Sequence, residues 1–275
     1  MKKVILILSG IIFFSSIGFG QGNTLEPTKV IRGVTDIKTG ISAPNATNIL
    51  VLRDVLPWSI NVTVPYLITQ GAIVSTGTSA DIPTLDFSQF NGIVIESVQP
   101  ESFKAVVAAN LSKFETFVSN GGCLEYHAVS WSSDPSPMTL PGGVISYFNY
   151  PGTTYELNYV VAASHPIAAG QPSPFNGYYA NHNIFQNLYP GTTVITTSPN
   201  NEPTTIEYQF GNGRVTATGC TYEYYQYPIF FNNLNYTLTC GSIEPPVETP
   251  VSNWALALGV LLIVVFTVFR MRRIS

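Results

Sequence analysis

The sequence predicts an α/β fold in which a mainly parallel sheet carries helices on both faces. Short, continuously apolar runs, typical of buried parallel strands, alternate with segments whose apolar residues recur every three to four positions, as in amphipathic helices. The clearest unit is a helix that begins near Pro100, stops at Gly121 and leads into a strand ending at His127. Strands joined by helices at this spacing form right-handed βαβ units.

The first half of the chain supplies the predicted parallel strands. Pro65 lies within one predicted helix and requires that helix to be kinked or to start late. The strands are expected at 48–52, 72–76, 93–96 and 123–127, with helices at 58–70 and 101–118.

The second half is predicted to be rich in β-structure. Pro151-Gly152 and the segment 211–213 are turn signals, and each favours a hairpin between its flanking strands. The expected elements are a hairpin of 143–150 with 154–162, strands at 193–197, 204–210 and 214–218, and a short helix at 228–239.

Composition limits the function classes. Charged residues make up 10% of the 275 residues, against about 25% in typical domains, and the net charge is −4. The body has no basic patch, so nucleic acid is not an expected partner. No glycine-rich phosphate loop, metal-binding cysteine pair or serine nucleophile elbow occurs, and we expect no cofactor and no metal.

The amino terminus has the pattern of a signal peptide over residues 1–20. Lys2 and Lys3 precede the apolar run Val4–Phe14, and small residues follow up to Gly20. A retained membrane helix is the alternative, although the run is shorter than the ~20 residues that a span needs. Residues 21–47 are interpreted as a leading arm with a weak strand near 29–34.

The carboxyl terminus has the pattern of a membrane segment. Trp254–Phe269 is apolar and is followed by Arg270, Arg272 and Arg273. Cytoplasmic arginines would leave the body of the protein outside the cytoplasm. We therefore expect export and attachment to the membrane, at the inner membrane or the cell surface, through a tail at 251–275 and a stiff proline-rich linker at 241–250.

The tail also resembles bacterial sorting signals. Pro250–Leu256, the apolar run and the arginines follow the order found in C-terminal tails of the exosortase and IPTL type. This resemblance implies a sorting enzyme that acts on the tail. A permanent single-pass anchor is the alternative.

The three cysteines are Cys123, Cys220 and Cys240. In an oxidising compartment Cys220 and Cys240 could pair and close a loop of about 20 residues, which would contribute ~3 kcal/mol. Three free, buried thiols are the alternative.

Four features in order carry a family resemblance. An apolar strand leads to Asp54, and an apolar strand follows a polar turn within 87–95. A helix stops on glycines before a strand within 117–124, and His165-Pro166-Ile167 is followed by 210–215. Together they resemble the class I glutamine-amidotransferase-like superfamily, most closely its ThuA-like branch, over about residues 48–225. The resemblance implies a flavodoxin-like fold for the domain at 48–240.

The same resemblance bears on catalysis. Amidotransferases carry a nucleophilic cysteine at the elbow after a central strand, whereas here the elbow falls at His127-Ala128-Val129. Cys123 precedes the strand and is interpreted as core packing, so the chain is not expected to be a glutamine amidotransferase. ThuA-like members typically have a histidine at the strand end, which His127 matches.

Candidate catalytic residues are His127, Asp54 and Glu96, because each lies at the expected carboxyl end of a parallel strand and such ends converge on one crevice. A histidine with two carboxylates could perform acid–base chemistry or bind a metal. The alternative is a core histidine with acids that cap helices. Glu125, inside the strand, needs a partner or an outward face.

Candidate ligand-pocket residues are His182, Glu223 and Tyr224, which lie in aromatic-rich segments. Such rings can stack on carbohydrate or simply pack against a sheet. His165 precedes a proline and is interpreted as structural. We expect a binding or structural module of a bacterial envelope without catalytic activity; the alternative is a ThuA-like, carbohydrate-related enzyme that uses His127 with Asp54 or Glu96.

Overall fold

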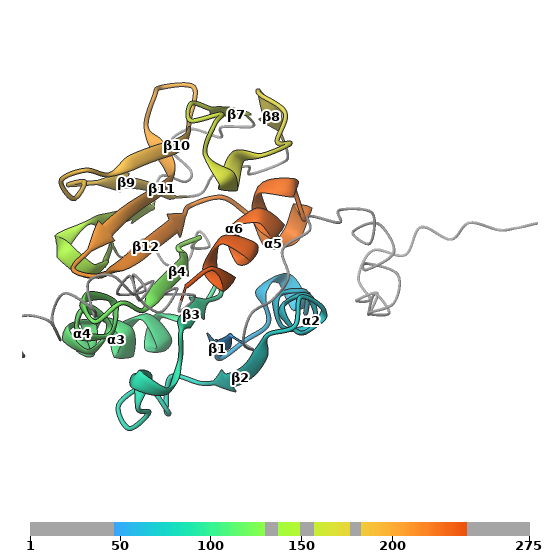
Figure 1. The fold of residues 1–275 in the computed structure, drawn as a ribbon. Helices are drawn as coiled ribbons and strands as arrows, with labels where there is room; N and C mark the ends of the chain where they lie inside the picture. Colours follow the sequence, from blue (N-terminus) through green and yellow to red (C-terminus); the bar gives the residue numbers. More distant parts are fainter. Residues whose placement is uncertain (1–46, 130–136, 149–156, 177–182, 241–275) are drawn as a thin grey trace, which may run out of the picture. The chain divides into compact units, whose positions relative to one another are not determined.

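The computed structural model describes residues 47–129, 137–148, 157–176 and 183–240 (Figure 1). The pattern of contacts between residues divides the chain into two units, 1–38 and 39–275, and every described residue belongs to the second unit. The signal peptide, leading arm, linker and tail expected from the sequence lie outside the described residues. Within them, no helix is long and apolar enough to cross a membrane.

A nine-stranded sheet forms the centre of the domain. Its parallel half confirms the strands expected in the first half of the chain, and it continues into an antiparallel half that confirms the β-rich carboxyl-terminal part. In spatial order the strands are β2 (Ile73–Gly77), β1 (Asn48–Leu52), β3 (Gly92–Ile95), β4 (Cys123–His127), β12 (Gly213–Thr218), β11 (Pro203–Phe210), β10 (Thr193–Thr197), β7 (Leu157–Val160) and β8 (Phe175–Asn176).

The predicted hairpin of 143–150 with 154–162 is wrong. β6 (Ile145–Phe148) lies in a second sheet, between β5 (Met138–Thr139) and β9 (Asn183–Gln186). β7 instead pairs with β10 and β8 in the large sheet. Buried polar contacts connect the same distant segments, since Asn183 of β9 donates to Ser146 of β6 and Thr204 of β11 donates to Asn158 of β7. Such long-range contacts override a local turn signal.

Two predicted helices differ in detail from the expectation. The helix expected at 58–70 starts late, so that Pro65 falls in its first turn, where proline is tolerated. The helix expected at 101–118 is interrupted at Asn110, whose side chain donates to the backbone oxygen of Val106 at 2.8 Å and competes with helical hydrogen bonds. The α-helices are α2 (Thr63–Thr69), α3 (Glu101–Ala109), α4 (Leu111–Ser119), α5 (Tyr222–Tyr225) and α6 (Pro228–Leu238).

Helices cover both faces of the parallel strands (Figure 1). On β4, Leu124 and Tyr126 belong to the apolar core that includes Phe114 of α4. Glu125 and His127 alternate with them, as side chains on a strand must. They therefore point to the opposite face, where α6 packs.

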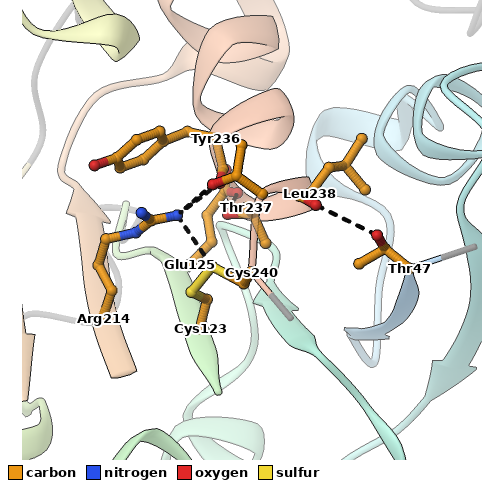
Figure 2. The surroundings of a disulfide bond; sticks show 9 residues. Thr47, Cys123, Glu125, Arg214, Tyr236, Thr237, Leu238 and Cys240 are labelled. Carbon is orange, nitrogen blue, oxygen red and sulfur yellow. Dashed lines mark hydrogen bonds between the residues drawn. A yellow bond between two sulfur atoms is a disulfide. The ribbon is translucent and has the colours of Figure 1, made fainter. Parts of the chain in front are cut away.

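The disulfide differs from the expected pairing. Cys123 is bonded to Cys240, with their Cα atoms 5.9 Å apart (Figure 2). Cys220 is a buried free thiol. Cys220 follows the carboxyl end of β12, whereas α6 returns the chain to the opposite edge of the sheet before Cys240. The expected Cys220–Cys240 pair is therefore separated by the length of α6, and Cys123 is a bridge residue rather than simple core packing.

Candidate functional site

The carboxyl end of β4 holds a histidine between two carboxylates. Nδ1 of His127 lies 2.6 Å from Oε1 of Glu223, and Nε2 lies 2.7 Å from Oε1 of Glu125. The side chains of all three residues are 0% exposed. Both ring nitrogens are thus occupied within the protein interior.

Two hydroxyl groups extend this arrangement. Thr237 of α6 donates to Oε2 of Glu125 at 2.6 Å, and Ser97, which follows β3, donates its hydroxyl to Oε1 of Glu223 at 2.8 Å and its backbone N–H at 3.0 Å. We call these five residues the His127 cluster: Ser97, Glu125, His127, Glu223 and Thr237.

The charge state of the cluster follows from its geometry. Burial alone lowers the pKa of His127, but the charges of Glu223 and Glu125 and their hydrogen bonds outweigh burial and raise it to about 10. Burial raises the pKa of Glu223, and the larger combined effect of His127 and Ser97 lowers it. At neutral pH the ring is an imidazolium that donates both protons, so it has no lone pair with which to act as a base.

The two other candidate acids take different partners. Oε2 of Glu96 lies 2.9 Å from Nη1 of Arg53; burial raises the pKa of Glu96, and Arg53 opposes this effect. Asp54 accepts hydrogen bonds from the backbone and hydroxyl of Ser79, both at 2.7 Å. Asp54 therefore fixes the loop after β2, and neither acid is one of the two ring-nitrogen partners of His127.

Gln99 is a site residue that sequence reasoning missed. Its Oε1 accepts from the backbone N–H groups of Asp54 and Val55, and its Nε2 donates to the backbone oxygens of Val55 and Ser97. The loops after β1 and β3 are thereby joined, and Ser97 joins them in turn to Glu223. A glutamine before Pro100 gives no local signal of this role.

Strained backbone gathers at the same edge. Trp58, Val98 and Gln226 have φ values of 47°, 59° and 52°. This left-handed region is unfavourable for residues with side chains, above all for a β-branched valine. These residues follow the carboxyl ends of β1, β3 and β12, and such strain tends to concentrate at functional sites.

Four aromatic residues, which we call the aromatic platform, lie beside these strained positions: Trp58, Tyr224, Tyr225 and Tyr227. The ring centres of Trp58 and Tyr224 are 5.9 Å apart, those of Tyr224 and Tyr225 are 5.0 Å apart, and those of Tyr225 and Tyr227 are 5.3 Å apart and stacked. Tyr224 is 51% exposed. Tyr224 is thus accessible, whereas its neighbour Glu223 is buried in the His127 cluster.

The remaining candidates are placed as follows. His182 lies outside the described residues. Nδ1 of His165 accepts a hydrogen bond from the backbone of Ile167, so this residue shapes the turn around Pro166. Across the described segments, no three His, Cys, Asp or Glu side chains are grouped in a way that could hold a metal ion.

Comparison with known proteins yields a distant sequence relative. No family model matches the chain. An uncharacterised protein of Clostridium acetobutylicum is 26% identical over 206 residues, which is 72% of this chain and 21% of the relative. The match thus spans about a fifth of the relative's length.

Some solved structures show a partial likeness to this chain. A ThuA-like protein from Parabacteroides merdae is 13% identical with a TM-score of 0.43, covering 71% of this chain and 91% of that chain. A GMP-synthase-like protein from Thermoplasma acidophilum is 14% identical with a TM-score of 0.46, covering 71% and 96%. A cytoplasmic protein from Salmonella typhimurium is 12% identical with a TM-score of 0.45, covering 70% and 97%. All three TM-scores lie below 0.5.

Proposed function

We propose that this chain is an exported, envelope-attached binding module without catalytic activity, and that its aromatic platform binds neutral carbohydrate. The observation that carries the proposal is a division of roles at the carboxyl edge of the parallel strands. The ionisable side chains there join loops to one another, whereas a ring of the platform is open to solvent.

The chemistry of the platform supports a neutral, ring-shaped ligand. The faces of tyrosine and tryptophan carry partial negative charge, which attracts the weakly positive C–H groups on one face of a sugar ring. Such stacking needs no formal charge, and the four platform residues carry none at neutral pH. The polar edges of the rings can also hydrogen-bond hydroxyl groups.

Three features support export and attachment. The signal-peptide pattern at 1–20 and the apolar segment Trp254–Phe269 bracket the domain. The Cys123–Cys240 disulfide fits an oxidising compartment, because such bonds persist mainly outside the cytosol. Intact-mass measurement of the membrane fraction separates the two forms of attachment, since a sorting enzyme would remove Arg270–Ser275 and a permanent anchor would retain them.

Titration with cello-, malto- and chito-oligosaccharides tests the binding proposal. We expect one series to bind saturably and Tyr224→Ala to weaken that binding by roughly two- to tenfold, since an aromatic contact contributes about 0.5–1.5 kcal/mol. Tyr159→Ala is the matched control, because Tyr159 on β7 is also exposed, at 37%. Absence of binding by all three series, or equal losses in the two variants, would contradict the proposal.

The enzyme alternative, in which Glu223 would orient His127 as a base, requires Nε2 of the ring to part from Glu125, because both ring nitrogens are occupied and buried in the structure. In that case the chain would hydrolyse one of the oligosaccharides, and His127→Gln would abolish turnover while binding persisted. The variants Asp54→Asn and Glu96→Gln would then show whether either acid takes part. We expect no turnover in the unaltered chain.

A further inference from the structure

The last turn of α6 lies at the amino-terminal edge of the sheet, opposite the aromatic platform. Cys240 is the last described residue, and its partner Cys123 is the first residue of β4. The parallel strands all begin at this edge. The end of the described chain is therefore held to β4 by a covalent bond (Figure 2).

Arg214 of β12 also binds the carboxyl-terminal end of α6. Its Nη2 donates to the backbone oxygen of Tyr236 at 2.6 Å and to Oγ1 of Thr239 at 3.2 Å, and it lies 3.0 Å from Sγ of Cys240. The guanidinium also lies over the ring of Tyr236, 3.5 Å from its centre. A cation placed here satisfies the free carbonyl groups at the carboxyl end of a helix and opposes its negative dipole end.

Two threonines add further connections. Thr237 donates to Glu125 in the middle of β4, and Thr47, which immediately precedes β1, donates to the backbone oxygen of Leu238 at 3.3 Å. Contacts from β4, from β12 and from the start of β1 thus converge on one helical turn. A single disulfide would fix one point, whereas these contacts fix the turn in orientation as well as position.

The helix itself separates the two functional ends. The residue that precedes α6 is Tyr227 of the platform, and α6 is 11 residues long, a length of ~16 Å. Tyr227 of the platform and Cys240 therefore lie beyond opposite ends of one rigid helix.

We propose that residues 236–240, which are the carboxyl-terminal end of α6 and the two residues after it, form a rigid attachment point. This point would hold the domain with its amino-terminal edge toward the membrane and its aromatic platform facing away. This inference rests on the attachment proposed above. The segment 241–250 is rich in proline, a composition typical of semi-rigid spacers, and such a spacer would limit how far the domain can turn.

Energy transfer in vesicles tests the orientation. The full chain is inserted into phosphatidylethanolamine–phosphatidylglycerol vesicles that contain a dansyl-labelled headgroup lipid. Two single-tryptophan variants share Trp131→Phe and Trp254→Phe. One retains Trp58 on the platform, and the other combines Trp58→Phe with Phe90→Trp at the amino-terminal edge, where Phe90 lines a hollow of about 390 Å³.

We expect transfer to the lipid to be at least threefold stronger from position 90 than from Trp58. The ratio of transfer from position 90 to transfer from Trp58 should approach one when Cys123 and Cys240 are both replaced by serine. Arg214→Gln, with the disulfide intact, should have the same effect. Circular dichroism checks that the sheet remains folded in each variant. Equal transfer in the unaltered background, or stronger transfer from Trp58, overturns the orientation. Failure of the chain to sediment with vesicles instead overturns the attachment, and the orientation with it.

Discussion

The two edges of the parallel strands are held in different ways. At the amino-terminal edge, a disulfide and Arg214 fasten the last turn of α6. At the carboxyl edge, the hydrogen bonds of Gln99 and Glu223 and the ion pair of Arg53 with Glu96 hold the loops without a covalent bond. The backbone there includes strained positions such as Val98. The difference indicates that one edge secures the fold, while the other maintains a shaped surface at the cost of strain.

β4 joins the two edges. It begins at Cys123 and ends at His127, and Glu125 between them accepts from Thr237 of α6 and contacts the His127 ring. Changes at either end of this strand therefore test how far the two edges depend on each other.

The largest effect is expected from removing the covalent bond. Replacing Cys123 and Cys240 together by serine should lower the free energy of unfolding by about 5 kcal/mol, because the bond closes a loop with a sequence separation of 117. Urea unfolding under non-reducing conditions measures this loss. Cys220→Ala, which removes a buried thiol outside the bridge, should cost about 1 kcal/mol. Similar losses in both variants would show that the amino-terminal edge does not depend on the bond.

The carboxyl edge is expected to depend on one buried cation. His127→Gln should lower the free energy of unfolding by about 3–5 kcal/mol, because Glu125 and Glu223 would remain buried without their positive partner. His165→Gln is the control, since that side chain is partly exposed and should matter by less than about 1 kcal/mol. A loss below about 1 kcal/mol in His127→Gln would mean that the carboxylates are neutral in the folded protein.

The pH dependence of stability sharpens the same point. The pKa of His127 is about 10 in the folded chain, above the ordinary 6.5, so its stabilisation is complete below pH 6.5 and is lost as pH rises toward 10. The pKa of Glu223 is lowered, so its contribution is present above its ordinary value of 4.5 and is lost in acid. Urea midpoints measured from about pH 5 to pH 10 should fall in the unaltered chain and fall less in His127→Gln. If the urea midpoints of the two proteins fell equally with pH, His127 would not be the group that causes the loss of stability.

The smallest effect on stability is expected at the platform. Tyr224→Ala removes an exposed ring that packs on neighbouring rings, so the free energy of unfolding should change by no more than about 0.5–1 kcal/mol. A thermal melt measures the change, and Tyr159→Ala again serves as the control. A loss above about 2 kcal/mol would place Tyr224 in the structural part of the carboxyl edge rather than on its binding surface.

Local sequence signals predicted the elements well where burial is continuous. The run from Cys123 to His127 is buried at every position, and it forms a strand with the predicted bounds. The strands at 193–197, 204–210 and 214–218 and the last helix are also confirmed, because alternating residues and turn glycines are local properties. The hairpin expected across Pro151-Gly152 is wrong because both of its strands pair with distant segments.

The candidate site was predicted in part. The position of His127 at a strand end follows from the sequence, and Glu223 and Tyr224 were singled out as pocket residues. The sequence does not reveal that Glu223 turns inward while Tyr224 remains exposed, since both lie on the single turn of α5. Ser97, Gln99 and Thr237 carried no signal, because a single hydroxyl or amide has no characteristic spacing.

The sequence by itself determined the strands and helices of the α/β fold and which strand ends in a histidine, because burial periodicity and glycine stops act within a few residues. Only the tertiary structure decided which polar groups and thiols meet. Cys123 finds Cys240 across 117 positions, and His127 finds Glu223 across 96. The positions of α6 and of the loop after β12 relative to the sheet bring these partners together. Those positions depend on the packing of the whole domain.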